Sequence, residues 1–135
     1  MIGGEFPRLT LGNYRVTSPA TTAYNCIAWS ARDVERWWQP GVYWPLPSDG
    51  HGPEVLELAF RSLGFEPCSD AQLELGFEKV ALYASGSFYT HAARQLGSGT
   101  WTSKLGKLED IEHDTPDAVA GGTYGEIFRF LKRPQ

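Results

Sequence analysis

The sequence predicts an α+β domain in which N-terminal helices pack on an antiparallel β-meander. Apolar residues recur with helical spacing in the first half of the chain, from Ile27 to Trp38 and again from Val55 to Leu63. The second half contains short apolar and alternating runs that are separated by glycine-containing turns. Helices followed by a run of strands are typical of this class, and 135 residues suffice for one domain with its own core.

The first predicted helix begins after an N-cap at Thr21 or Thr22 and runs to about Trp37. The Gln-Pro-Gly sequence that follows Trp38 stops it. Residues 39–52 then form a loop that is rich in proline, glycine and aromatic residues. We expect this loop to lie near any functional site and to carry its specificity.

The remaining elements follow in order along the chain. They are a strand-like patch over 13–16, a helix over 53–63, a short edge strand over 64–68, strands over 77–83, 88–96, 101–105 and 111–113, and a strand or helix over 123–132. Residues 1–20 are expected to form an extended segment, whose first residues could be vector-derived. Residues 21–135 are expected to form a single domain.

Composition argues against several classes of function. The net charge is −4 and no cluster of lysine or arginine is present, which disfavours nucleic acid as a partner. No apolar run approaches the roughly 20 residues of a membrane span, and no signal-peptide pattern is visible. Two cysteines do not form a disulfide framework. We therefore expect a cytoplasmic protein, or one exported by a dedicated secretion machine, and the oligomeric state stays open.

Cys26 and His91 are the candidate reactive residues. Cys26 would lie in the first turn of its helix, where backbone N–H groups and the helix dipole favour a thiolate and lower its pKa. His91 lies on an alternating strand, so Tyr89, His91, Ala93 and Gln95 are predicted to share one face. Such a pair can form a nucleophile and base. A small core cysteine and a hydrogen-bonded strand histidine are the alternative explanation.

The segment Tyr24-Asn25-Cys26-Ile27-Ala28-Trp29 resembles the nucleophile segment of NlpC-type hydrolases, members of the papain-like superfamily of cysteine hydrolases. The order of His91, a Gly-Ser-Gly hairpin and Ser103 is similar to the order of histidine, hairpin and third polar residue in those enzymes. The resemblance implies a papain-like core with Cys26 as nucleophile, His91 as base and Ser103 as the residue that orients the imidazole. It also implies that the Tyr24 hydroxyl contributes to the oxyanion site.

The same resemblance implies a thiol-dependent hydrolase or acyl transferase of the peptidase, amidase or deamidase type, acting on a peptide or protein with an amide group. The alternative is a papain-like binding or immunity module without turnover. Gln95 is expected to contact substrate, and His113 to orient His91, bind substrate or cap a turn. The spacing of cysteines and histidines predicts no metal site, and no cofactor is expected. A closer resemblance, over residues 24–133, is to a bacterial family of unknown function.

Overall fold

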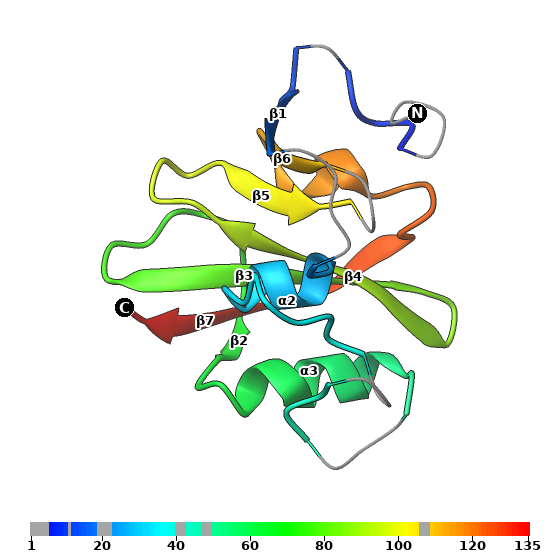
Figure 1. Ribbon diagram of the computed structural model, residues 1–135. Helices are drawn as coiled ribbons and strands as arrows, with labels where there is room; N and C mark the ends of the chain where they lie inside the picture. The colour runs from blue at the N-terminus through cyan, green and yellow to red at the C-terminus, as the bar shows by residue number, and fades with distance from the viewer. Residues whose placement is uncertain (1–5, 11, 19–22, 40–42, 47–49, 106–108) are drawn as a thin grey trace.

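The protein is described by a computed structural model, and in its described part a seven-stranded antiparallel sheet is accompanied by two short helices and one turn of 3₁₀ helix (Figure 1). The structure describes residues 6–10, 12–18, 23–39, 43–46, 50–105 and 109–135. The predicted α+β fold with a papain-like core of N-terminal helices is therefore wrong. Only five residues of α2 and nine of α3 are helical, too few to form a helical layer. No described helix has the length and apolar character needed to span a membrane.

The elements occur along the chain in an order that separates the helices from most strands. They are β1 (Tyr14–Ser18), α2 (Cys26–Ser30), α3 (Pro53–Arg61), β2 (Glu66–Cys68), β3 (Phe77–Ser85), β4 (Phe88–Gln95), β5 (Trp101–Lys104), β6 (Asp110–His113), the 3₁₀ helix η1 (Pro116–Val119) and β7 (Glu126–Pro134). In space the strands lie in the order β1-β6-β5-β4-β3-β7-β2.

Successive antiparallel pairs join β3, β4, β5 and β6, so the predicted meander of hairpins is present within the sheet. The segment that sequence left open between strand and helix is strand β7, which pairs with β3 on one side and β2 on the other. The predicted edge strand near residue 66 is confirmed, since β2 ends the sheet. The predicted helix over 53–63 is α3, and Pro53 at its first position needs no N–H partner.

The sheet has a hydrophobic core on each face. We call the first the helix-side core; its buried residues are Tyr24, Cys26, Ile27, Ala28, Trp38, Leu56, Phe60, Phe65, Val80, Leu82, Ala92 and Leu131. We call the second the outer core; its buried residues are Phe6, Leu9, Ala81, Tyr83, Ala93, Trp101, Leu105, Ile111, Ala118, Val119, Ala120 and Tyr124. Alternate residues of β3 and β4 point to opposite cores, as strand geometry requires. The N-terminal segment contributes Phe6 and Leu9 to the outer core.

The first helix is much shorter than the sequence predicts. Asn25 is its N-cap, and its Oδ1 atom accepts hydrogen bonds from the N–H groups of both Ala28 and Trp38. The Asn25 amide nitrogen also donates to the Trp38 carbonyl at 2.7 Å, so the chain folds back onto the helix start. Arg32 then takes a left-handed conformation with φ of 65°, which ends the helix. The predicted N-caps, Thr21 and Thr22, lie outside the described residues.

Candidate functional site

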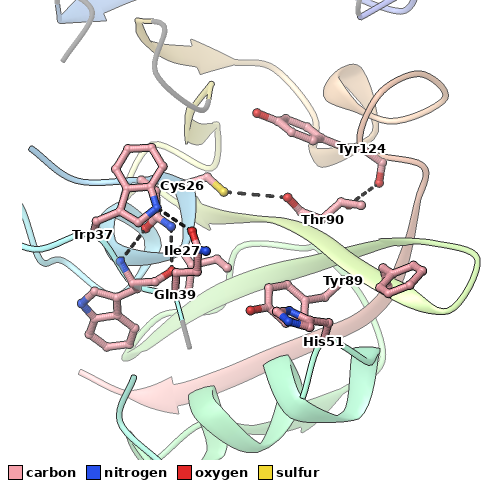
Figure 2. Close-up of a pocket in the computed structure, with 11 residues that line it drawn as sticks. Cys26, Ile27, Trp37, Gln39, His51, Tyr89, Thr90 and Tyr124 are labelled. Carbon is pink, nitrogen blue, oxygen red and sulfur yellow. Dashed lines mark hydrogen bonds between the residues drawn. The ribbon is translucent and has the colours of Figure 1, made fainter. Parts of the chain in front are cut away.

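A pocket of about 340 Å³ opens beside Cys26 (Figure 2). Its lining residues come from the start of α2, the segment after α2, the segment before α3, the first half of β4 and the segment before β7. They are Asn25, Cys26, Ile27, Trp37, Trp38, Gln39, His51, Phe88, Tyr89, Thr90 and Tyr124. Of the 39–52 loop that the sequence expects near the site, Gln39 and His51 line the pocket, and residues 40–42 and 47–49 lie outside the described part of the chain.

Cys26 is the first residue of α2, and its Sγ atom lies 4.0 Å from the Thr90 carbonyl oxygen. In Figure 2 the sulfur points across the pocket toward Thr90, with Tyr124 beyond. Cys26 can lie beside Thr90 because β5 pairs with β4 only at Arg94 and Gln95. The earlier part of β4 therefore has no β5 partner, and the start of α2 occupies the gap beside it. The sulfur thus lies at a strand edge.

The electrostatics of Cys26 are opposite to those that the sequence predicts. Burial raises the pKa of the thiol to about 11. Backbone N–H groups of Ala92 and Ile27, and the positive charge of Lys104, favour the thiolate but do not outweigh the loss of water. The prediction of a lowered pKa from the helix start is therefore wrong, because a five-residue helix is a weak dipole and Cys26 is only 7% exposed. The resting thiol is protonated.

His91 lies on the other side of its strand. Its imidazole is fully buried and packs against Tyr83 and Tyr124 of the outer core, whereas Cys26 belongs to the helix-side core. Within the described residues no hydrogen bond joins Cys26 Sγ to His91. The resting structure therefore does not bring the two predicted catalytic groups into contact.

The sequence predicts that Tyr89 and His91 lie on the same face of β4, and a β-bulge between them places them on opposite faces. Tyr83 pairs with His91 and Ala84 pairs with Tyr89, so Thr90 is an extra residue in β4. Tyr89 consequently packs against the helix-side core, while His91 projects into the outer core. The bulge also turns the Thr90 hydroxyl toward the Tyr124 carbonyl, which accepts its hydrogen bond at 2.5 Å.

Ser103 and His113 join His91 in a buried hydrogen-bond chain. His91 Nε2 lies 3.0 Å from Ser103 Oγ, and Ser103 Oγ lies 2.8 Å from His113 Nε2. His113 Nδ1 lies 2.7 Å from the Thr115 carbonyl oxygen. Ser103 and His113, the two residues that the sequence proposes to orient His91, are therefore consecutive members of one hydrogen-bond chain, and the contact to His91 is through Nε2.

The direction of each hydrogen bond in this chain follows from its last member. A carbonyl oxygen only accepts, so His113 Nδ1 carries its hydrogen and, in a neutral ring, Nε2 accepts from the Ser103 hydroxyl. The Ser103 oxygen then accepts from His91 Nε2, which must carry the hydrogen of that ring. His91 Nδ1 is left as an unprotonated lone pair. It is buried and has no hydrogen-bond partner among the described residues.

Both histidines are neutral at physiological pH. Burial, with a smaller contribution from His113, holds the pKa of His91 well below its usual 6.5. Burial also lowers the pKa of His113 to about 4, against the opposing effect of the Thr115 carbonyl. These directions agree with the neutral rings that the hydrogen-bond chain requires.

Tyr24, the predicted oxyanion residue, has its hydroxyl committed elsewhere. It donates to Asp110 Oδ2 at 2.6 Å, and burial together with this carboxylate raises the pKa of Tyr24 to about 12. Lys104 Nζ lies 5.7 Å from the centroid of the Tyr24 ring. Lys104 is fully buried, and its desolvation lowers its pKa while Asp110 and Cys26 oppose the shift. Tyr24, Asp110 and Lys104 thus form a buried polar cluster close to the thiol.

Gln95 lies at the far end of β4 from Cys26. Its amide nitrogen donates to the Ala71 carbonyl at 2.8 Å, and it lines a separate small pocket. The structure therefore does not place Gln95 with the other candidate residues. Among the described residues no group of three histidine, cysteine, aspartate or glutamate side chains could hold a metal ion.

Sequence reasoning does not identify Tyr124, Asp110 or most of the aromatic residues that line the pocket. The sequence places Tyr124 in the segment 123–132, which it predicts to be a strand or a helix, and nothing in the spacing of Tyr124 connects it with residue 91. Phe88 and Tyr89 were recognised as strand residues, but the bulge that directs Tyr89 to the pocket has no sequence signal. The pair Trp37-Trp38 could have indicated an aromatic site, because two adjacent tryptophans at a predicted helix end rarely both fit one buried face.

Residues 15–132 match a family described as Domain of unknown function (DUF7689). Neither a curated protein nor a solved structure matches the chain.

Proposed function

Because the chain belongs to the family described as Domain of unknown function (DUF7689), which assigns no activity, we propose from the site that the protein is a thiol-dependent hydrolase or acyl transferase acting on an amide. Cys26 is the nucleophile and His91 the base. The observation that carries the proposal is the unprotonated Nδ1 atom of His91, which has no partner among the described residues and which the hydrogen bonds through Ser103 and His113 hold in its basic form. Buried polar atoms without a partner are rare in proteins and call for a role.

The proposed reaction begins from two neutral groups. As Cys26 Sγ attacks the amide carbonyl carbon, the thiol proton passes to His91 Nδ1, and the resulting imidazolium then protonates the departing amine. A thioester on Cys26 remains. Water, or an acceptor amine, attacks this thioester with His91 again taking the proton, which releases the acyl group and restores the thiol.

The resting structure requires one rearrangement before this reaction. The two side chains lie in separate cores, and Tyr124 covers the face of the His91 ring. Tyr124 also lines the Cys26 pocket, so it is the side chain whose displacement would join the pocket and the imidazole.

The second candidate function is binding without turnover. The raised pKa of Cys26 and the enclosed imidazole of His91 favour it, since both describe a core without an activated nucleophile. In this case the pocket holds a ligand, and the buried polar chain serves only to stabilise the sheet.

Labelling with peptidyl chloromethyl ketones distinguishes the thiol enzyme from the binding protein. These reagents alkylate a cysteine that has a catalytic histidine beside it. On the first proposal wild-type protein is labelled at Cys26, Cys26→Ala is not labelled there, and Cys68→Ala labels as the wild type does. His91→Ala loses the labelling but keeps its reaction with iodoacetamide in the denatured state. Near-ultraviolet circular dichroism checks that each variant is folded. Equal labelling of wild type and His91→Ala would leave binding as the function.

A further inference from the structure

The residues that line the pocket beside Cys26 indicate which kind of ligand it binds. We infer that it holds an uncharged aromatic side chain, and on the proposed function this side chain belongs to the substrate residue next to the reactive amide. The inference rests on the proposed function only for that second clause, because the pocket binds the ring whether or not Cys26 reacts.

The walls of the pocket are mostly ring systems. Trp37, Trp38, Phe88, Tyr89 and Tyr124 line it together with the imidazole of His51. Aromatic pairs in tilted or offset arrangements contribute about 0.5–1.5 kcal/mol beyond the burial of area, so a wall of rings favours another ring over an aliphatic chain. Figure 2 shows the rings on both sides of the Cys26 thiol rather than on one wall.

The existing rings of the pocket already pack in this way. The Tyr89 ring stacks on Trp44 with centroids 5.7 Å apart and an interplanar angle of 17°. The His51 ring lies 6.3 Å from Tyr89 and is tilted by 34°. The contacts with Trp44 and His51 thus fix the orientation of the Tyr89 ring before a ligand binds.

The described residues that line the pocket offer no countercharge for a charged ligand. None of its described lining residues is aspartate, glutamate, lysine or arginine. Burial raises the pKa of Tyr89 to about 12, which shows that negative charge is disfavoured at this wall. A charged side chain would lose water on entry without gaining a partner, and such a loss is costly.

Only a few polar groups of the wall remain to orient a ligand. The Asn25 amide is used by Ala28 and Trp38, and the Gln39 oxygen accepts from the Trp37 indole N–H. The Gln39 amide nitrogen and the His51 ring can still bond a ligand. A neutral amide that flanks an aromatic ring presents groups that match these two.

The size of the pocket agrees with one side chain and its flanking amides. Sites that enclose drug-sized molecules occupy roughly 300–1,000 Å³, and this pocket of about 340 Å³ is at the lower end. A long peptide would therefore extend from the pocket over the surface, with only one residue inserted.

Calorimetric titration of Cys26→Ala tests the inference without turnover. The ligands are N-acetyl amides of phenylalanine, leucine, lysine and glutamate. We expect saturable binding of the phenylalanine amide, weaker binding of the leucine amide, and binding of the two charged amides that is weaker by at least about tenfold. Lysine or glutamate amide binding as tightly as phenylalanine amide, or no binding of phenylalanine amide, overturns the inference.

Two surface variants in the Cys26→Ala protein provide the matched comparison. Phe88 is 62% exposed at the pocket and Leu75 is 92% exposed in another region, so neither substitution removes a core residue. Phe88→Ala should weaken binding of the phenylalanine amide by about tenfold, and Leu75→Ala should not change it. Equal affinities of the two variants place the ligand elsewhere and overturn the inference.

These outcomes are independent of the labelling experiment. Binding of the aromatic amide without labelling of Cys26 removes the proposed thiol chemistry and leaves the aromatic pocket. Labelling of Cys26 without aromatic binding retains the chemistry and removes the pocket assignment.

Discussion

The phenol ring of Tyr124 lies flat against the imidazole of His91, with ring centroids 3.9 Å apart and an interplanar angle of 5°. The next residue, Gly125, has φ of 70°, and a Cβ atom there would clash with the Ala84 carbonyl oxygen. Only glycine fits this position, so the backbone that carries Tyr124 has little freedom. Tyr124 therefore covers His91 through its side-chain rotamer, and the side chain alone can uncover it.

Replacing Tyr124 should expose the imidazole of His91 to the pocket. Burial is the main reason that the pKa of His91 is low, so Tyr124→Ala should raise this pKa toward 6.5. The measurement is an NMR titration of the His91 ring protons in the wild-type and Tyr124→Ala proteins. A His91 pKa that is the same in both proteins would show that other residues exclude the water.

The Ser103 hydroxyl should contribute to stability beyond its size. Ser103→Ala leaves both His91 Nε2 and His113 Nε2 buried without a partner, and each such loss costs about 1–3 kcal/mol. Urea denaturation measures the change in the free energy of unfolding. The matched control is Ser98→Ala, since the Ser98 hydroxyl bonds Thr100 at an exposed turn where water can replace it. Equal effects of the two substitutions would mean that the buried chain is not formed.

Cys26 should react more slowly than Cys68 with a small alkylating agent at neutral pH. The Cys26 thiol is buried with a pKa of about 11, whereas Cys68 is partly exposed. Mass spectrometry of the two cysteine peptides after iodoacetamide treatment at pH 7.5 measures both rates. Faster alkylation of Cys26 would restore the activation that the helix start predicts and refute the effect of burial.

Folding stability should decrease as the pH falls from about 6.5 toward 4.5. The folded-state pKa values of His91 and His113 lie below the unfolded value near 6.5, so the unfolded chain binds protons first in this range. Each histidine can contribute a slope of up to about 1.4 kcal/mol per pH unit. The carboxylates with lowered pKa values act only at lower pH. Urea denaturation at several pH values measures the slope, and a flat profile would contradict neutral buried histidines.

The sequence predicts the strands of this protein better than its architecture. The alternation in 88–95 and the glycine-containing turns identify the hairpins correctly, because these are local signals. The end of α2 at Ser30 depends on Asn25, which bonds Trp38 and turns the chain back, and this contact spans thirteen residues. Helical spacing of apolar residues continues to Trp38, so the pattern alone predicts a helix that tertiary contacts prevent.

In the candidate site, too, local contacts can be predicted from the sequence and contacts set by tertiary structure cannot. The proximity of Ser103 to His91 follows from the hairpin between their strands, which sequence can align. The relation of Cys26 to His91 depends on which face of the sheet the helix covers and on the bulge at Thr90. Neither is encoded in a short pattern, so the roles of these residues in catalysis stay predictions.

The contact between Cys26 and Thr90 joins residues that are 64 positions apart in the chain. The β3–β4 hairpin, by contrast, closes over a short turn after Ser85 and needs little loss of chain entropy to form. The edge of β4 exists as soon as that hairpin forms, but the helix start must be brought back across the intervening residues to reach it. Closing a contact of this sequence separation costs more chain entropy than closing the hairpin. The thiol is therefore protected from oxidation and alkylation only in chains in which the helix start has docked on β4.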